Sequence, residues 1–328
     1  MSILHKCARA ALISVVAFSA TGLVNTRTEA QLTLTAAGVL RGFTLSTFAT
    51  GFSSSSSVGP LGIGFNGDGT VLVTDFPGAI HKFPSHADGQ VASAGNLVSS
   101  NAQGTVIGIA RSGANLYVSD QTNGTLKNLS AGGIVGSVVV SGMPSATGVT
   151  ANPTNGHIFV STLGNNVIWD VDPVAATKTN FLNQTADGLS TDGTNLFMES
   201  NNHILGYRIS DKALIFDSGT MGCAPDGTEL GSGTLAGYIY VNCNNGQFFE
   251  VNLTTNSQVA IADSGSRGDF VSTDPTNGTL LITQTDRVIR LTAPKGGGFG
   301  QTPEPGVTVG LAGLGVMGAG LLLRRRRK

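Results

Sequence analysis

One pattern recurs six times along the middle of the chain, and it constrains the fold more than any other feature. Each copy begins with an apolar or small segment, passes through a Gly/Asn/Asp turn into a β-branched or aromatic strand, and ends with a polar turn and another strand. The copies begin at Gly62, Gly108, Gly148, Gly188, Gly222 and Phe270. Their spacings of 46, 40, 40, 34 and 48 residues match the length of one four-stranded propeller blade. The sequence therefore predicts an all-β fold, a six-bladed β-propeller.

The ends of the repeated region indicate how the ring closes. The sixth copy stops after its third strand, and the strand-like segment 43–48 before the first copy has no other assignment. We expect 43–48 to complete blade six, because a closed ring leaves no exposed sheet edge. The propeller is then a single domain over 42–293, followed by a flexible glycine-rich linker over 294–302. A β-sandwich would not repeat at this period, and a parallel β-helix would repeat at a shorter one.

Composition agrees with many short strands and tight turns. The 328 residues include 46 glycines, and only 12% of them are charged. This balance excludes a coiled coil, an ordinary helical bundle and a charge-rich disordered protein. Dipeptides such as Asp68-Gly69, Asn155-Gly156, Asp192-Gly193, Asp226-Gly227 and Asn277-Gly278 are expected to form hairpin turns, since they lack the spaced carboxylates of a calcium loop.

The N-terminus has the features of a secretory signal peptide. Lys6 and Arg9 precede an acid-free apolar run over 10–24, and small residues follow at 28–30. We expect residues 1–30 to be a signal peptide cleaved after Ala30. A retained membrane anchor is the alternative, but 15 apolar residues are short for a span of about 20.

The C-terminus predicts a single transmembrane helix. Pro303, Glu304 and Pro305 precede an uncharged stretch over 306–323 and then five cations over 324–328. As a helix the uncharged stretch would rise about 27 Å, near the ~30 Å of a hydrocarbon core, with the cations on the cytoplasmic side.

This order of Pro-Glu-Pro, glycine-rich span and terminal arginines resembles the PEP-CTERM sorting signal of Gram-negative bacteria, which covers residues 303–328. The resemblance implies that an exosortase-type membrane protease recognises Pro303, Glu304 and Pro305. It also implies a transient stay in the inner membrane, then delivery to the cell surface or an extracellular matrix. The alternative is a permanent anchor in the inner membrane, for which the glycines of 306–323 would suit close helix packing.

The body of the chain is acidic. Residues 31–302 contain 11 Lys and Arg against 18 Asp and Glu, a net charge of about −7. Nucleic acid is therefore disfavoured as a partner, because its binding depends on neutralising phosphates with cations. An exopolysaccharide or a small molecule remains the candidate ligand.

The repeats over about 42–293 resemble the six-bladed group of NHL-repeat proteins, streptogramin lyases and gluconolactonases. Gluconolactonase-like enzymes hold a divalent metal with a Glu before Gly-Pro, an Asn before a later Gly and an Asp before Gly in the next blade. The matching positions here are Val58, Thr147 and Asp187, so only Asp187 keeps the family's residue. We therefore assign no metal ligands, with Ca²⁺ as the only candidate cofactor. The lyase comparison finds no histidine with a clear acid partner, so the body histidines are interpreted as surface or edge residues.

The mouth of the central channel is the predicted binding surface. It should be lined by the residues just before each repeated position, namely Leu61, Ile107, Thr147, Asp187, Met221 and Asp269. Asp187 and Asp269 would be the only charges in this ring. With Thr147 beside them they would bind a cation or sugar hydroxyls, or else simply be solvated in a wet pore.

Two cysteines remain once the signal peptide removes Cys7. Cys223 and Cys243 are expected on the first and second strands of the fifth repeat, close enough for a disulfide that would clip an enlarged loop over 226–236. A zinc site would need two further ligands, and none is evident.

The sequence as a whole favours an exported binding or structural module over an enzyme. The alternative is a degenerate metal-dependent lactonase, esterase or lyase that uses Asp187 and Asp269.

Overall fold

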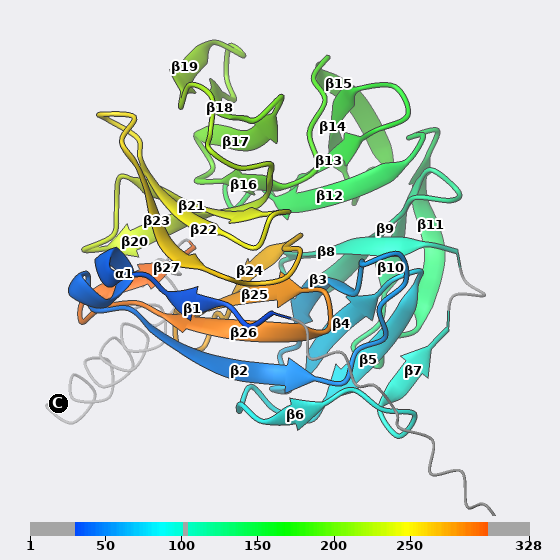
Figure 1. Ribbon diagram of the computed structural model, residues 1–328. Helices are drawn as coiled ribbons and strands as arrows, with labels where there is room; N and C mark the ends of the chain where they lie inside the picture. The colour runs from blue at the N-terminus through cyan, green and yellow to red at the C-terminus, as the bar shows by residue number, and fades with distance from the viewer. Residues whose placement is uncertain (1–29, 101–103, 301–328) are drawn as a thin grey trace, which may run out of the picture.

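Six antiparallel sheets radiate from a common centre (Figure 1), in a computed structural model that describes residues 30–100 and 104–300. The predicted all-β class and the six-bladed propeller are confirmed. The strands of each blade are given from the inner strand outward. Blade one consists of β3 (Pro60–Phe65), β4 (Val71–Asp75), β5 (Ala79–Phe83) and β7 (Leu97–Ser99), and blade two of β8 (Val106–Ser112), β9 (Asn115–Asp120), β10 (Thr125–Leu129) and β11 (Val135–Ser141). Blade three consists of β12 (Ala146–Ala151), β13 (Ile158–Thr162), β14 (Val167–Asp172) and β15 (Thr177–Leu182).

Blades four to six follow the same order, with the last strand of blade six supplied by the N-terminal part of the chain. Blade four consists of β16 (Leu189–Thr191), β17 (Asn195–Ser200), β18 (His203–Arg208) and β19 (Leu214–Asp217). Blade five consists of β20 (Pro225–Gly233), β21 (Tyr238–Cys243), β22 (Phe248–Asn252) and β23 (Gln258–Asp263). Blade six consists of β24 (Val271–Thr273), β25 (Leu280–Gln284), β26 (Arg287–Thr292) and β2 (Thr44–Thr50).

The closing strand lies where the sequence predicts it. β2 pairs antiparallel with β26, so that Leu45 lies opposite Leu291 and Thr44 opposite Thr292. A short strand, β6 (Gln90–Val91), adds in parallel to the outer edge of β2. Segments from both ends of the repeated region therefore share one sheet, which joins blade six to blade one.

The second strand of each blade lies deepest in the molecule. All five residues of β4 are buried, as are all five of β13, since both faces of these strands pack against neighbouring blades. Their composition is rich in Val, Ile, Leu and Phe, as a strand buried on both sides requires. Hairpin turns connect the strands, and in four of the predicted Asp-Gly and Asn-Gly turns the glycine has a positive φ. These glycines are Gly69, Gly156, Gly193 and Gly278.

The folded body extends beyond the predicted bounds of 42–293. β1 (Thr33–Leu34) pairs with β23, and α1 (Ala36–Leu40) follows it. At the other end β27 (Gly297–Phe299) pairs with Gly231–Gly233 of β20. The segment 294–302, expected to be a flexible linker, thus contains a paired strand. Phe299 explains the difference, because its ring is only 2% exposed and lies 4.9 Å from the ring of Tyr240.

Blade five corrects the predicted repeat. Its inner strand pairs Pro225 with Cys243 and Thr228 with Val241, the same bulged register that pairs Pro60 with Asp75 in blade one. Gly227, and not Gly222, therefore corresponds to the repeated glycine. The last two spacings become 39 and 43 residues, which are more regular than the predicted 34 and 48.

Two further expectations about blade five are wrong for the same reason. Asp226 and Gly227 form no hairpin turn, since both lie within β20. Most of the predicted loop over 226–236 belongs to that strand as well. Two glycines five residues apart gave the repeat two possible registers, and only the pairing with β21 distinguishes them.

No helix in the described parts of the chain has the length and apolar character needed to cross a membrane. The predicted signal peptide, except for Ala30, lies outside the described residues, as does the predicted transmembrane helix over 306–323.

Candidate functional site

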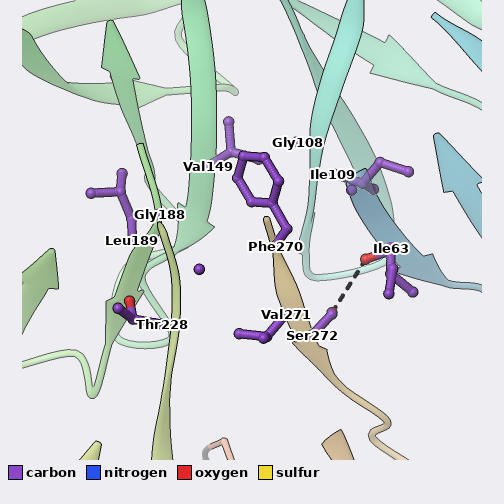
Figure 2. Close-up of a pocket in the computed structure, with 12 residues that line it drawn as sticks. Ile63, Gly108, Ile109, Val149, Gly188, Leu189, Thr228, Phe270, Val271 and Ser272 are labelled. Atoms are coloured by element: carbon purple, nitrogen blue, oxygen red, sulfur yellow. Dashed lines mark hydrogen bonds between the residues drawn. The ribbon is translucent and has the colours of Figure 1, made fainter. Parts of the chain in front are cut away.

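Glycines of the inner strands nearly close the central channel. A side chain at Gly148 would overlap the carbonyl of Asp187, and one at Gly188 would overlap the carbonyl of Asp226. The remaining cavity is about 30 Å³, enough for about one water molecule. Figure 2 shows the ring of Phe270 directed into this space, toward Val149 and Gly108. A ligand larger than water must therefore bind at the mouth of the channel and not within it.

In blades one to three, a hydroxyl near the end of the second strand joins neighbouring blades around this channel. In blade one the Thr74 hydroxyl accepts the Gly62 N–H at 2.7 Å and donates to the Ile107 carbonyl of blade two at 2.7 Å. Ser119 and Ser161 occupy the same position in blades two and three and make the same pair of bonds. The repeated hydroxyl thus satisfies two buried backbone groups at once.

Asn242 and Thr283 hold this position in blades five and six. The Asn242 amide donates to the Asp269 carbonyl at 3.2 Å, and the Thr283 hydroxyl donates to the Phe270 carbonyl at 2.9 Å. The Asn242 bond reaches the next blade, whereas the Thr283 bond stays within blade six, and both side chains are neutral donors.

Blade four departs from the pattern, because the equivalent residue is Glu199. Its Oε1 accepts the N–H of Asp187, while Oε2 is buried and has no hydrogen-bond partner. The side chain is 7% exposed. Burial raises the pKa of Glu199 well above its usual range, and the neighbouring charges of Asp187 and Asp226 raise it further.

Four carboxyl groups converge at this point of the mouth, those of Asp187, Glu199, Asp226 and Asp269. Burial raises the pKa of Asp187 to about 6, with a contribution from Asp269, although a hydrogen bond from Thr147 opposes the shift. Burial also raises the pKa of Asp226 well above its usual range, and the charges of Asp187 and Asp269 add to the effect. One oxygen each of Asp187 and Asp226 is buried without a partner.

Arg267 supplies a positive charge beside the four acids. Its Nε and Nη2 donate to Oδ1 of Asp269 at 3.0 and 2.6 Å. The Asp269 carboxyl is buried, whereas the arginine side chain is 37% exposed and Asp187 is half-buried. The acid cluster, meaning Asp187, Glu199, Asp226 and Asp269 with Arg267, therefore meets solvent through Asp187 and Arg267.

The residues present do not fit the metal set of gluconolactonase-like enzymes. Val58 and Thr147 stand at two of its three positions. Within the described residues, no three His, Cys, Asp or Glu side chains are arranged to hold a metal ion. The acid cluster is instead a group of crowded carboxyls whose raised pKa values favour protonation.

The C-terminal tail matches a known sorting motif. Residues 301–327 match the PEP-CTERM protein-sorting motif. The predicted resemblance of the tail to this signal is thus confirmed at the level of sequence, and the motif implies processing by an exosortase. The tail itself, with Pro303, Glu304 and Pro305, lies outside the described residues.

Solved structures show the same fold as the body of this chain. A gluconolactonase from Xanthomonas campestris superposes with a TM-score of 0.62 at 14% identity, covering 81% of this chain and 95% of the other. An auxiliary nutrient binding protein from Bacteroides thetaiotaomicron gives 0.54 at 10% identity, covering 79% and 77%. A streptogramin B lyase gives 0.50 at 13% identity, covering 77% and 98%. No curated protein matches the sequence. Likeness at such low identity extends to the fold alone.

The predicted channel residues lie together, but the predicted ring was incomplete. Asp187 and Asp269 belong to the acid cluster, and Thr147 is buried beside Asp187. Asp226 takes the place predicted for Met221, so Asp187 and Asp269 are not the only acids of the ring. Sequence reasoning also missed Glu199 and Arg267. Glu199 was detectable, since it replaces Thr, Ser or Asn at one position of every other repeat.

Cys223 and Cys243 form a disulfide, with Cα atoms 6.0 Å apart. Cys243 is the last residue of β21, as expected for the second strand. Cys223 instead precedes β20, whose first residue is Pro225. The bond therefore fixes the segment that leads directly into Asp226.

The four body histidines each bond to a carboxylate or an amide. The pairs are His81 with Asn96, His86 with Asp274, His157 with Asp170, and His203 with Asp217. Their partners are residues outside the acid cluster.

Proposed function

We propose that this protein is an exported propeller that acts as a binding module at the cell surface or in an extracellular matrix, with the acid cluster as its ligand site. The sorting motif at 301–327 supports export and processing by an exosortase-type protease. The closed channel supports a site at the mouth, where a bound ligand contacts Asp187 and Arg267 first.

Glu199 is the observation that carries the proposal. A hydroxyl at this position would join blades four and five, as the hydroxyls of blades one to three join each blade to the next, whereas a buried carboxyl with an unpartnered oxygen costs about 1–3 kcal/mol or more. Three further acids surround it. A cluster that destabilises the fold is explained by a ligand that completes its hydrogen bonds.

The chemistry of the cluster favours a polyhydroxylated ligand, such as a sugar unit of an exopolysaccharide. Protonated carboxyls donate and accept hydrogen bonds, and Arg267 adds further donors. Sugar hydroxyls need both kinds of partner. A divalent cation would instead displace the protons and bind the ionised carboxylates.

Calorimetric titration of the mature secreted protein tests this proposal. The injected ligands are neutral oligosaccharides from the producing cell's matrix, then Ca²⁺, Mg²⁺ and Zn²⁺, together with a panel of lactones and esters assayed for turnover. We expect saccharide binding that Glu199→Gln or Asp187→Asn weakens at least about tenfold, the value of one lost charge-assisted hydrogen bond. Asp211→Asn is the matched control, because Asp211 is an exposed acid outside the acid cluster that contacts Arg208 and the Ala213 N–H.

A metal-dependent lactonase or lyase is the second candidate function. Asp187 keeps the residue of the gluconolactonase motif, and a gluconolactonase has the same fold as the body of this chain. Tight metal binding with turnover of a lactone or ester would support this second candidate and contradict the first.

The sorting signal has a separate test. We expect replacement of Pro303, Glu304 and Pro305 by alanine to trap the uncut precursor in the inner membrane with the propeller folded, because these residues follow the last described strand. An epitope placed after Lys328 reports cleavage directly. Its retention on mature protein recovered outside the inner membrane would contradict exosortase processing.

A further inference from the structure

The short helix α1 presents two apolar side chains to solvent from a rigid position. The Thr35 hydroxyl accepts the Gly38 N–H at 3.2 Å and donates to the Ala260 carbonyl at 2.8 Å. Gly38 is buried against the backbone of β23. Val39 and Leu40 are nevertheless 62% and 89% exposed. Their exposure is thus a property of the ordered fold and not of a loose terminus.

This helix lies at the place where the chain leaves the propeller (Figure 1), beside β27. Gly42 approaches the side chain of Pro294, and the ring of Phe43 stacks on that of Phe299 with centroids 6.5 Å apart. The N–H of Thr234 bonds to the carbonyl of Gly296 at 2.9 Å. Three segments therefore meet here, residues 36–42, 231–237 and 294–300, which we call the exit corner.

The charge of the exit corner differs from that of the body. Its three segments contain no Asp or Glu, and they contain two cations, Arg41 and Lys295. Arg41 pairs with Glu250 at 2.6 Å, while Lys295 is exposed. On a body of net charge about −7, this corner is neutral to positive. A corner of this charge is suited to contact anionic lipid headgroups. The acidic remainder of the body would be repelled by them.

The tether brings this corner close to the membrane. The uncharged stretch over 306–323 begins six residues after Gly300, and six residues span at most about 20 Å. When that stretch is inserted in a bilayer, the exit corner is held within this distance of the lipid headgroups.

We propose that the exit corner rests on the anionic lipid surface in which the precursor is anchored, with Val39 and Leu40 in the headgroup boundary and Lys295 among the phosphates. This inference depends on the anchoring step of the proposed function and is independent of the ligand site. Two aliphatic side chains and one cation bind lipid weakly by themselves. The tether raises their effective concentration to the millimolar range, so contact holds before cleavage and is lost after it.

Fluorescence of the full-length precursor in phosphatidylglycerol-containing vesicles tests the contact. An environment-sensitive probe is placed on Leu40→Cys, with Cys7→Ser to remove the free thiol. The control probe is on Val174→Cys, which is 92% exposed in the turn between β14 and β15 of blade three. We expect nitroxide lipids to quench the Leu40 probe at least about twofold more than the Val174 probe.

A charge variant and a vesicle control sharpen the result. Lys295→Glu should reduce quenching in phosphatidylglycerol vesicles but not in pure phosphatidylcholine vesicles, because only the former present anionic headgroups. Equal, water-like emission from both probes on an inserted precursor would overturn the exit-corner proposal alone. A precursor that does not insert would overturn the anchoring step together with this proposal, and the ligand titrations of the mature protein would be unaffected.

Discussion

Blades three and four share one backbone plan, and they differ in the residue at the buried position near the end of the second strand. In blade three Ser161 accepts the Gly148 N–H at 2.9 Å and donates to the Asp187 carbonyl at 3.0 Å. In blade four Glu199 accepts one N–H and leaves an oxygen unpartnered. The first arrangement serves the fold. The second costs stability, and it stands beside three other acids at the channel mouth. In a repeat protein, the position that breaks the repeated hydrogen bonds therefore marks the candidate site.

The largest expected loss of stability follows from substitution of a repeated glycine in an inner strand. Gly227→Ala should destabilise the propeller by about 3 kcal/mol, because the new Cβ would overlap the Asp269 carbonyl. Gly222→Ala is the matched control, since nothing lies within 4 Å of its Cβ position. Urea unfolding of both variants measures the difference. Equal losses would show that the register assigned to blade five is wrong.

Removal of the disulfide should destabilise the folded protein slightly less than Gly227→Ala does. Cys223 and Cys243 close a loop with a sequence separation of 20, for which chain entropy predicts about 3 kcal/mol or somewhat less after native strain. Thermal unfolding of Cys223→Ser/Cys243→Ser against the wild-type protein measures this loss. Non-reducing mass analysis provides the independent check: secreted protein in which both thiols accept a label would contradict the bond.

Exchange of the Ser161 and Glu199 side chains tests the comparison of blades three and four directly. Glu199→Ser should raise stability by about 1–3 kcal/mol, because it removes the buried unpartnered oxygen and places a hydroxyl where Ser161 makes two hydrogen bonds in blade three. The same variant should lose ligand binding. Ser161→Glu, the reciprocal change in blade three, should destabilise the fold. A Glu199→Ser protein that is less stable than wild type would contradict the cost assigned to this carboxyl.

The smallest effect is a pH dependence of stability. The pKa of Asp187 rises from 3.8 to about 6 in the folded protein, and burial raises that of Asp226 in the same direction. The folded state then keeps protons that the unfolded chain has lost. Stability from these groups is complete below about pH 4 and is lost as pH rises through about 6.

Chemical denaturation at several pH values measures this slope. It should be shallower in Asp187→Asn, which removes one titrating group. A stability that rises steadily from pH 4 to pH 7 in the wild-type protein would contradict the raised pKa values.

The sequence by itself determined the six blades, the closing strand over 43–48 and most of the hairpin turns. These depend on local patterns, since alternating turns and β-branched runs repeat wherever a blade begins. It also determined the sorting tail, whose three parts are contiguous along the chain. Asp187, Thr147 and Asp269 could be placed at the channel mouth because each directly precedes a repeated position of the sequence.

Only the tertiary structure decided which residues join them. The pairing of β20 with β21 places Asp226 in the ring of residues at the channel mouth. The sequence did not specify this register, because Gly222 and Gly227 both fit the repeated glycine. Glu199 matters because its neighbours come from other blades, and burial among them raises its pKa. Phe299 turned an expected linker into a strand, because its ring occupies a slot between Phe43 and Tyr240. Burial and cross-strand register are properties of residues distant in sequence, so no local pattern could have specified them.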